Sequence, residues 1–314
     1  MHRISGYTSL EAKQRGAVIA LGNFDGVHEG HARVVERAAQ LAQTCHAPLG
    51  VALFHPHPRR FFAPDAPPFR LMSADRRDER LTGLGVKTVY ELPFTAEMSQ
   101  MSPESFVKEV LVDGLGIAGV VTGLDFHFGK GRAGSAEDLA DLGRRYGFQT
   151  AFAELLDNGV DKVSSTRIRK ALSDGDVKAA ATLLGEVWSI EGEVLHGDKR
   201  GRTIGFPTAN IALGDYTRPA YGVYAVQAKL PGQAKAHPGV ANFGKRPTVD
   251  GETERLEVHL FDFDGDLYGQ TLSVSFEAFI RPEKAFAGID ALKAQIAEDA
   301  LSARTLLTGA AGPV

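Results

Sequence analysis

The stretch Gly16 to Gln43 reads GAVIALGNFDGVHEGHARVVERAAQLAQ. Residues 16–22 form a short apolar run that predicts a buried strand, and residues 32–43 have the apolar spacing of an amphipathic helix. A glycine-rich turn joins the two and contains His28 and His31. The stretch therefore predicts a strand that leads through a tight loop into a helix, the unit from which parallel sheets are built.

This alternation of strand and helix continues to about residue 184. The further strands that we expect are 47–54, 86–93, 117–124 and 148–156, and the further helices are 75–83, 103–113 and 136–146. Residues 164–185 read as two short helices that are broken at Asp174-Gly175. The pattern predicts an α/β domain with a mostly parallel sheet and helices on both faces.

The pattern of apolar and polar residues changes after Trp188. The segments 188–195, 222–230, 255–263 and 272–280 are strand-like, and Asp264-Gly265 predicts a tight hairpin turn between the last two. Such antiparallel strands indicate a small barrel or a sandwich. The chain closes with a helix at about 288–308, whose apolar face would carry Ile289, Leu292, Ile296 and Ala303. We therefore expect two domains, residues 1–185 and 186–314.

Composition limits the classes of protein that the chain can belong to. It has 314 residues and a formal net charge of −4, and it lacks the basic stripe of a nucleic-acid-binding protein. One cysteine, Cys45, excludes an intrachain disulfide and fits a reducing compartment. The N-terminal residues lack the apolar core of a signal peptide, and no apolar run reaches the roughly 18 residues that a membrane helix needs. We expect a soluble, cytoplasmic protein that binds neither nucleic acid nor membranes, and its oligomeric state stays open.

The turn with the two histidines is the first candidate site. A helix that follows a strand of a parallel sheet presents free N–H groups and its positive dipole end to anions. Glycines let a phosphate approach, and His28 and His31 can donate hydrogen bonds to oxygens whose charge grows in the transition state. The turn thus points to a nucleoside triphosphate. Two alternatives are a turn with incidental histidines and a zinc site that His55 and His57 complete.

Four segments resemble a known family. GNFDGVHEGH (22–31) is similar to the signature of nucleotidylyltransferases. Together with FHPHP (54–58), TGLDFHFGKGRAG (122–134) and SSTRIR (164–169), it resembles the bacterial bifunctional riboflavin kinase/FMN adenylyltransferases, or FAD synthetases. The resemblance implies a Rossmann-like nucleotidylyltransferase domain that converts FMN and ATP into FAD and pyrophosphate. The sequence departs from the family pattern at His55, where an acidic residue is expected.

The same resemblance implies roles for individual residues. His28 and His31 would stabilise the α-phosphate of ATP, and Arg167 would cover the leaving pyrophosphate unless it is only a solvated helix residue. The remaining ligand-binding residues that it implies are Gly22, Phe24, Asp25, Gly26, Gly30, Pro56, Pro58, Phe62, Asp125, Phe128, Ser164, Ser165 and Thr166. The pair Phe61-Phe62 could stack a flavin ring or only pack its own loop.

The second candidate site begins with GDKRGRTIGFPTAN (197–210). An extended chain would place Thr208 and Asn210 on one face, where a hydroxyl and an amide could hold a hydrated magnesium ion beside ATP phosphates. In RLEVHLFDF (255–263), Glu257 lies on the face opposite the apolar residues. From the pattern alone, this carboxylate is either functional or simply solvated.

The segments GRTIGFPTAN (201–210), NFGKRPT (242–248) and RPEKAF (281–286) are similar to riboflavin kinases. The resemblance implies a β-barrel that phosphorylates riboflavin to FMN with Mg²⁺ and ATP. Thr208 and Asn210 would bind Mg-ATP, and Glu257 would take the proton from the ribityl hydroxyl. Arg281 would lie in the loop that closes over the flavin. The other ligand-binding residues implied are Gly201, Gly205, Pro207 and Asn242.

Several other patterns resemble known motifs without meeting their requirements. GKGRAG (129–134) is not at the end of a strand, GVANFGKR (239–246) has Arg246 where a P-loop has serine or threonine, and the glycine of DFDGD (262–266) comes too early for a calcium loop. Two rival functions stay open. One is nucleotidyl transfer to another phosphorylated molecule with a non-catalytic barrel, and the other is a regulator that binds flavin without turnover.

Overall fold

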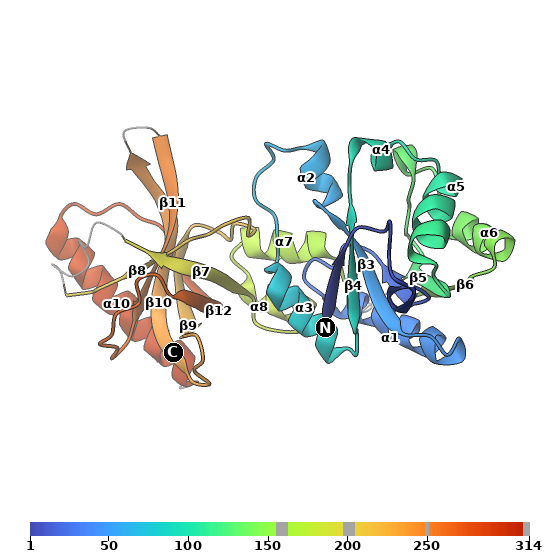
Figure 1. Cartoon of the computed structure of the whole chain (residues 1–314). Coiled ribbons are helices and arrows are strands. Elements are labelled where there is room, and N and C mark those ends of the chain that lie inside the picture. Colours follow the sequence, from blue (N-terminus) through green and yellow to red (C-terminus); the bar gives the residue numbers. More distant parts are fainter. Residues whose placement is uncertain (155–162, 197–204, 249–250, 310–314) are drawn as a thin grey trace. The chain divides into compact units, whose positions relative to one another are not determined.

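The computed structural model describes residues 1–154, 163–196, 205–248 and 251–309. The chain forms two compact units (Figure 1). The first contains Met1–Pro67 and Ala74–Ser164, and the second contains Pro68–Ser73 and Ser165–Val314. A short segment from the first half of the sequence thus belongs to the second unit. The domain boundary at 185 stays a prediction.

The first unit is built on a parallel sheet of six strands. Their order is β1-β4-β3-β2-β5-β6, and every neighbouring pair is parallel. The bounds are β1 His2–Ser5, β2 Val18–Leu21, β3 Leu49–His55, β4 Thr88–Pro93, β5 Gly119–Gly123 and β6 Gln149–Ala153. The five predicted strands are confirmed. The edge strand β1 was not predicted, because four largely exposed residues carry no apolar pattern.

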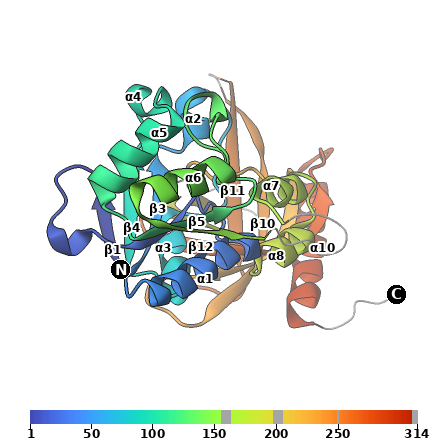
Figure 2. The same cartoon turned by 90° about the vertical axis from the view of Figure 1, so that its right-hand side faces the viewer.

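The helices of this unit cover both faces of the sheet (Figures 1 and 2). Three predicted helices are confirmed as α1 (Glu29–Thr44), α3 (Ala74–Gly83) and α6 (Ala136–Tyr146). The fourth begins as α5 (Pro103–Ser105), with Ser102 as its cap, and continues as a π-helix, η2 (Phe106–Leu115). Short elements that were not predicted are η1 (Ala12–Gln14), α2 (Pro58–Phe62), α4 (Ala96–Ser99) and η3 (Lys130–Arg132).

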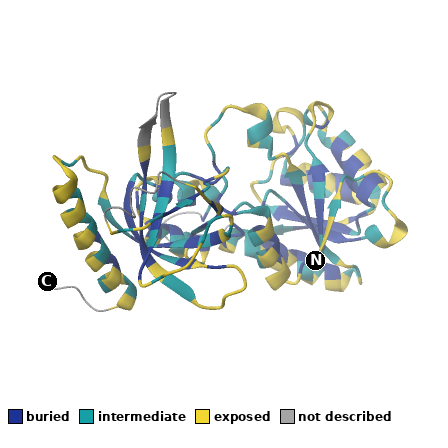
Figure 3. Cartoon of the chain, turned by 60° about the vertical axis from the view of Figure 1, so that its left-hand side comes forward, coloured by how far each residue is buried: buried dark blue, intermediate teal, exposed yellow. Residues whose placement is uncertain are grey.

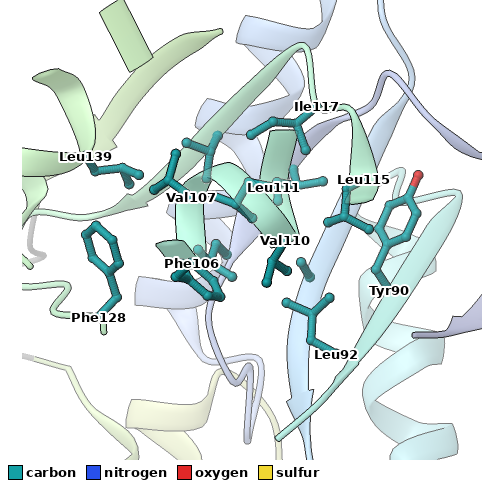
Figure 4. Close-up of a cluster of buried hydrophobic side chains, with 14 of the residues drawn as sticks. Tyr90, Leu92, Phe106, Val107, Val110, Leu111, Leu115, Ile117, Phe128 and Leu139 are labelled. Atoms are coloured by element: carbon teal, nitrogen blue, oxygen red, sulfur yellow. The ribbon is translucent and has the colours of Figure 1, made fainter. Parts of the chain in front are cut away.

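One part of the core of this unit lies between the sheet and the π-helix. Ile19 and Leu21 of β2 join a buried cluster with the apolar side chains of η2, among them Phe106 and Leu111 (Figure 4). Because side chains alternate along a strand, Val18 and Ala20 point to the opposite face, where α1 packs against β2, β5 and β6. Since β2 lies between β3 and β5, the chain reverses its direction of travel across the sheet at this strand. Ligands of open α/β sheets bind at such a switch point, beside the carboxyl ends of the strands.

The second unit is a closed antiparallel barrel, as the resemblance implied. The strand order is β10-β11-β8-β7-β12-β9. The bounds are β7 Ser189–Leu195, β8 Ala209–Ile211, β9 Gly222–Lys229, β10 Ala236–Thr248, β11 Gly251–Leu260 and β12 Thr271–Pro282. The strands β8 and β10 were not predicted, because β8 has only three residues and β10 contains prolines and glycines.

One prediction for the barrel is wrong. Asp264-Gly265 was expected in a tight hairpin, but β11 pairs with β8 and β10, whereas β12 pairs with β7 and β9. The two strands are therefore not neighbours, and the dipeptide lies in the connection 261–270 that passes from one to the other. A local turn signal cannot reveal that β7 and β8 separate the two strands when the barrel closes.

Three helices in the described part of the second unit accompany the barrel. The predicted pair is confirmed as α7 (Ser165–Ser173) and α8 (Val177–Leu184), and Gly175 between them has a φ of 81°. The last helix, α10 (Ile289–Thr308), packs against β9, β10 and β12. Its buried side runs through Asp299 and Ala303, and Figure 3 shows an exposed side of the helix in yellow. Ile289 is 52 % exposed and was wrongly placed on the apolar face. Among the described residues, no helix is both long and apolar enough to cross a bilayer.

Candidate active sites

The loop after β2 has an unusual backbone that burial holds in place. Phe24, Gly26 and Val27 all have positive φ angles, of 52°, 96° and 39°. For Phe24 and Val27 this conformation costs on the order of 1–3 kcal/mol each. Both side chains are 1 % exposed, so packing against the core offsets the cost. The loop is therefore a rigid entry to α1, with the predicted Asp25 and Gly26 inside it.

His28 and His31 meet at the N-terminus of α1. His28 is the N-cap residue, and its Nδ1 accepts the backbone N–H of His31 at 3.3 Å. In a neutral ring the proton is then on Nε2, which can donate to an anion. The ring of His31 stacks on that of His28, with centroids 3.8 Å apart, and lies 5.2 Å from the ring of Phe24. The two predicted histidines form one unit at the positive end of a helix.

Side chains approach two of the glycines at this site closely. A Cβ on Gly30 would lie 3.2 Å from the ring of His28 and 3.6 Å from the carbonyl oxygen of Val163. A Cβ on Gly22 would lie 3.3 Å from the ring of Phe24. Val163, which directly precedes the predicted Ser164, therefore lies beside the first turn of α1.

Other predicted residues follow the neighbouring strands. Asp125 lies in a turn after β5, and its carboxylate is 3.0 Å from the position of a Cβ on Gly123. Pro56 follows His55, the last residue of β3, through a cis peptide bond, and Pro58 is the first residue of α2. Because parallel strands end at the same edge of a sheet, these residues share that edge with the histidines. Ser165, Thr166 and Arg167 begin α7, which belongs to the second unit, so their roles at the phosphates stay predictions.

A ladder of aromatic rings connects the predicted Phe128 and Phe62. Phe128 contacts Phe106, Phe106 contacts Phe54, Phe54 contacts Phe94, and Phe94 contacts Phe62, with centroids 5.5–6.0 Å apart. The ladder runs from a buried ring to one that is 67 % exposed. Sequence reasoning did not connect the three middle rings, because they lie in β3, directly after β4 and in η2, which are far apart in the chain.

The second site is a row of polar side chains on the barrel. In the strand register, Glu257 of β11 lies opposite Asn210 of β8 on one side and Asn242 of β10 on the other. Directly paired residues point to the same face of a sheet. That face is the outer one, because Leu256 and Val258 on either side of Glu257 are buried. The structure thus brings three predicted residues together.

The oxygen atoms at this row fit a magnesium ion. Oδ1 of Asn210 is buried and has no hydrogen-bond partner among the described residues. Thr208 precedes it by two residues, so its hydroxyl lies on the same side of the extended chain. Mg²⁺ prefers oxygen ligands and keeps several of its waters. Among the described residues, no group of three or more His, Cys, Asp or Glu side chains could hold a metal, so the zinc alternative gains no support.

Two hollows in the barrel unit adjoin the segment 207–210. One of about 610 Å³ includes Pro207 and Thr208 in its lining, together with the loop residues Phe263 to Tyr268. The other, of about 760 Å³, includes Asn210, Arg218, Tyr221 and Glu254. Sequence reasoning missed the loop 263–268 because it assigned those residues to a hairpin. Gly205 is exposed before this segment, and Gly201 lies outside the described residues.

An ionic cluster lines the larger hollow. The carboxylate of Glu254 accepts hydrogen bonds from Nε of Arg218 and from the hydroxyl of Tyr221, both at 2.7 Å. Burial alone would raise the pKa of Glu254, but these hydrogen bonds and the charges of Arg218 and Lys245 hold that pKa below its ordinary value. The cluster keeps the hydroxyl of Tyr221 in a polar contact, while its ring stacks on that of Phe243.

Arg281 is bound to the last helix. Its Nε and one terminal nitrogen donate to the two carboxylate oxygens of Asp299, at 2.8 and 2.6 Å. Asp299 is 4 % exposed and also accepts from the amide of Gln295 at 3.0 Å. Arg281 lies in β12, so its predicted place in a loop is wrong, because it pairs with Val223 of β9 at the end of the barrel sheet. Its ion pair joins the end of β12 to α10, and its contact with flavin stays a prediction.

Comparisons with known proteins match two consecutive parts of the chain to two families. The sequence profile of the FAD synthetase family matches residues 10–167, and that of the riboflavin kinase family matches residues 184–307. The bifunctional riboflavin kinase/FMN adenylyltransferase of Pseudomonas fluorescens is 42 % identical over 98 % of both chains. The protein of the same description from Escherichia coli K12 is 41 % identical over 97 % of both chains.

A solved structure shares the whole fold. A protein from Streptococcus pneumoniae, described as a macrolide-efflux protein, superposes with a TM-score of 0.86. It is 32 % identical, and the match covers 97 % of this chain and 99 % of that one. Its description concerns that protein, and the relatives above agree on a different activity. The chain belongs to the family of bifunctional riboflavin kinase/FMN adenylyltransferases, with a FAD synthetase part followed by a riboflavin kinase part.

Proposed function

We propose that the barrel unit phosphorylates riboflavin to FMN, and that the parallel-sheet unit then transfers an adenylyl group from ATP to FMN. The first reaction releases ADP and the second releases pyrophosphate. The observation that carries this proposal is that each unit has its own polar site, the stacked histidines in one and the row around Glu257 in the other. The single cysteine and the use of ATP favour a cytoplasmic location.

In the adenylyl transfer, a phosphate oxygen of FMN attacks the α-phosphorus of ATP. The bond from that phosphorus to the bridging oxygen breaks, and pyrophosphate leaves. Nε2–H of His28 and the ring of His31 donate to the α-phosphate oxygens, whose negative charge grows as the new bond forms. Such donors are effective because they are already oriented before the reaction.

The aromatic ladder supplies the flavin site of this unit. Phe62 is the most exposed ring, Phe106 and Phe128 are both buried, and Phe54 and Phe94 connect Phe106 with Phe62. A flat ring system gains both apolar burial and stacking against such faces. Asp125, at the end of the neighbouring strand β5, and the prolines 56 and 58 border the phosphate side of the site.

In the kinase reaction, Glu257 takes the proton from the terminal ribityl hydroxyl as that oxygen attacks the γ-phosphorus of ATP. The bond to the β-phosphate oxygen breaks and ADP leaves. Asn210 and Asn242 flank the carboxylate and orient it and the acceptor. Thr208 and the orphaned Oδ1 of Asn210 would hold Mg²⁺. When bound, this ion neutralises charge on the transferred phosphate.

We propose that each of the two hollows binds one substrate of the kinase reaction. We assign ATP to the hollow with Thr208, since Phe263 and Tyr268 offer aromatic faces for the adenine. Riboflavin then binds in the hollow with Asn210, whose cross-strand partner is the base. Both reacting groups meet at the segment 207–210.

One incubation tests the proposal. Purified protein is mixed with riboflavin, ATP and MgCl₂, and the flavins are separated by chromatography over time. The proposal expects FMN first and FAD after it. Unchanged riboflavin together with adenylation of added FMN would favour a barrel without kinase activity. If neither flavin changed, flavins would be excluded as substrates, in favour of another phosphorylated acceptor or of a protein that only binds flavin.

A further inference from the structure

The segment Pro68–Ser73 lies in the sequence of the FAD synthetase part, yet it belongs to the barrel unit. It leaves the first unit after α2 and returns to it at α3. Three of its six side chains are buried, with Phe69, Leu71 and Met72 exposed by 2 %, 1 % and 6 %. We call these six residues the strap. Such complete burial makes the strap an integral part of the core of that unit.

Hydrogen bonds fix the strap at both of its ends. The indole Nε1 of the buried Trp188 donates to the carbonyl oxygen of Leu71 at 2.8 Å. Nε of Arg169 donates to the carbonyl oxygen of Phe69 at 2.7 Å, and the same guanidinium lies over the ring of Phe69. The hydroxyl of Ser73 donates to the carboxylate of Glu191. These partners come from α7, from β7 and from the residue before β7.

The centre of the strap pairs with a segment that lines the larger hollow. The N–H of Arg70 donates to the carbonyl oxygen of Asp215 at 2.8 Å, and the N–H of Thr217 donates to the carbonyl oxygen of Arg70 at 2.7 Å. The guanidinium of Arg70 also lies 3.4 Å from the carboxylate of Asp215. On either side of this pairing, Leu213, Gly214 and Arg218 line the hollow.

Arg218 links the segment 213–218 to β11, the strand that contains the proposed base Glu257. It donates to the carbonyl oxygens of Gly214 and Tyr216 with one nitrogen and to Glu254 of β11 with another. Glu254 precedes Glu257 by three residues on the same strand. A shift of the segment 213–218 would therefore change both the wall of the hollow and its ionic cluster.

We propose that the strap is a positioning element of the riboflavin kinase site: residues encoded within the FAD synthetase part hold the segment Leu213–Arg218 against the riboflavin hollow. This inference rests on the proposed kinase activity of the barrel and on the assignment of riboflavin to that hollow. Its consequence is that a change in the first half of the sequence affects the reaction of the second unit.

Two matched substitutions in the full-length chain test this. Leu71→Ala and Leu81→Ala remove the same side chain from fully buried positions ten residues apart, one in the strap and one in α3 of the first unit. We expect Leu71→Ala to raise the KM for riboflavin at least about fivefold, the equivalent of one lost hydrogen bond, and to leave adenylation of added FMN within about twofold. Leu81→Ala should leave the KM for riboflavin unchanged.

The split between KM and kcat separates positioning from mere stabilisation. If the strap only stabilised the barrel, Leu71→Ala would lower the fraction of active enzyme and hence the apparent kcat, with the KM unchanged, and that result would overturn the proposal. Should Leu71→Ala fail to fold, Ser73→Ala removes one hydrogen bond and should still raise the KM for riboflavin. If the wild-type chain has kinase activity and both variants keep the wild-type KM, only the positioning role of the strap is refuted. If the wild-type chain has no kinase activity, the proposed function is refuted as well.

Discussion

The rings of His28 and His31 are stacked, with centroids 3.8 Å apart and planes inclined by 15°. The stack is fixed because Nδ1 of His28 caps the helix on which His31 lies. The same bond leaves the proton of a neutral His28 ring on Nε2, the atom that we propose donates to a phosphate. Positioning of the donor and capping of the helix are thus combined in one side chain.

Substitution of either histidine should slow adenylyl transfer. His31→Ala removes one donor and the ring against which His28 packs, so FMN adenylation should fall on the order of 10²-fold or more. The measurement is the initial rate of FAD formation from FMN and ATP. His28→Asn serves as a second variant, because asparagine keeps a helix cap but cannot reproduce the Nε2 donor. A rate within threefold of wild type in both variants would contradict the role of the histidines.

Gly30→Ala tests the geometry of the stack without touching either ring. The new Cβ would lie 3.2 Å from the ring of His28 and would push it from its place. We expect adenylation to fall at least about tenfold, since small misplacements of reacting groups are costly. Gly83→Ala in α3 is the matched control, because its Cβ would meet no atom within 4 Å. Equal rates for both variants would show that the ring of His28 does not need its present position.

The ion pair between Arg281 and Asp299 should contribute strongly to the stability of the barrel unit. Asp299→Asn leaves a guanidinium that is 19 % exposed without its charge partner. Breaking such a buried pair typically costs about 3–5 kcal/mol, and asparagine should keep the loss near the lower end. Urea unfolding of the full chain gives the change. Asp262→Asn removes the exposed partner of Arg304 on the same helix and should have little effect, so equal losses would contradict the importance of burial.

Stability of the barrel unit should depend on the charge of Glu254. Because its pKa is lowered in the folded state, the carboxylate stabilises the fold above its ordinary pKa of 4.5, and this contribution is lost as the pH falls through the lowered value. Glu254→Gln should therefore lower the Tm near neutrality, and the difference from wild type should shrink as the medium is acidified. Thermal unfolding followed at several pH values measures this.

Glu277 provides a control of opposite sign. Burial raises the pKa of Glu277, so its charged form is less favourable in the folded chain than in the unfolded one. Glu277→Gln should raise the Tm at neutral pH and lose this advantage on acidification. A gain for Glu254→Gln at neutral pH would contradict the role assigned to its cluster.

Local sequence patterns predicted most elements of the fold and indicated two candidate sites. The turn 22–31 carries strand, loop and helix signals within ten residues, and Glu257 stands out because its neighbours on the strand are apolar. Both signals can be read from residues that are close in sequence or that lie on one strand. The pairing of Glu257 with Asn210 and Asn242 is long-range, and the resemblance to known kinases named the three residues without predicting their pairing.

The features that sequence reasoning missed depend on distant contacts. Phe94 and Phe106 look like ordinary core residues until the sheet brings them beside Phe62. The hairpin at Asp264-Gly265 had the right turn residues but the wrong neighbouring strands. The strap has a short apolar pattern that fits either unit, and only its partners Trp188 and Asp215 determine where it belongs.

The central claim is that the two units catalyse two separate reactions. The most direct test compares His31→Ala with Glu257→Gln, each given riboflavin or FMN together with ATP and MgCl₂. We predict that His31→Ala forms FMN at the wild-type rate but little FAD, and that Glu257→Gln adenylates FMN normally but loses on the order of 10²- to 10⁴-fold in phosphorylation of riboflavin. If Glu257→Gln phosphorylated riboflavin at the wild-type rate, or if either folded variant lost both reactions together, the assignment of one reaction to each unit would be wrong.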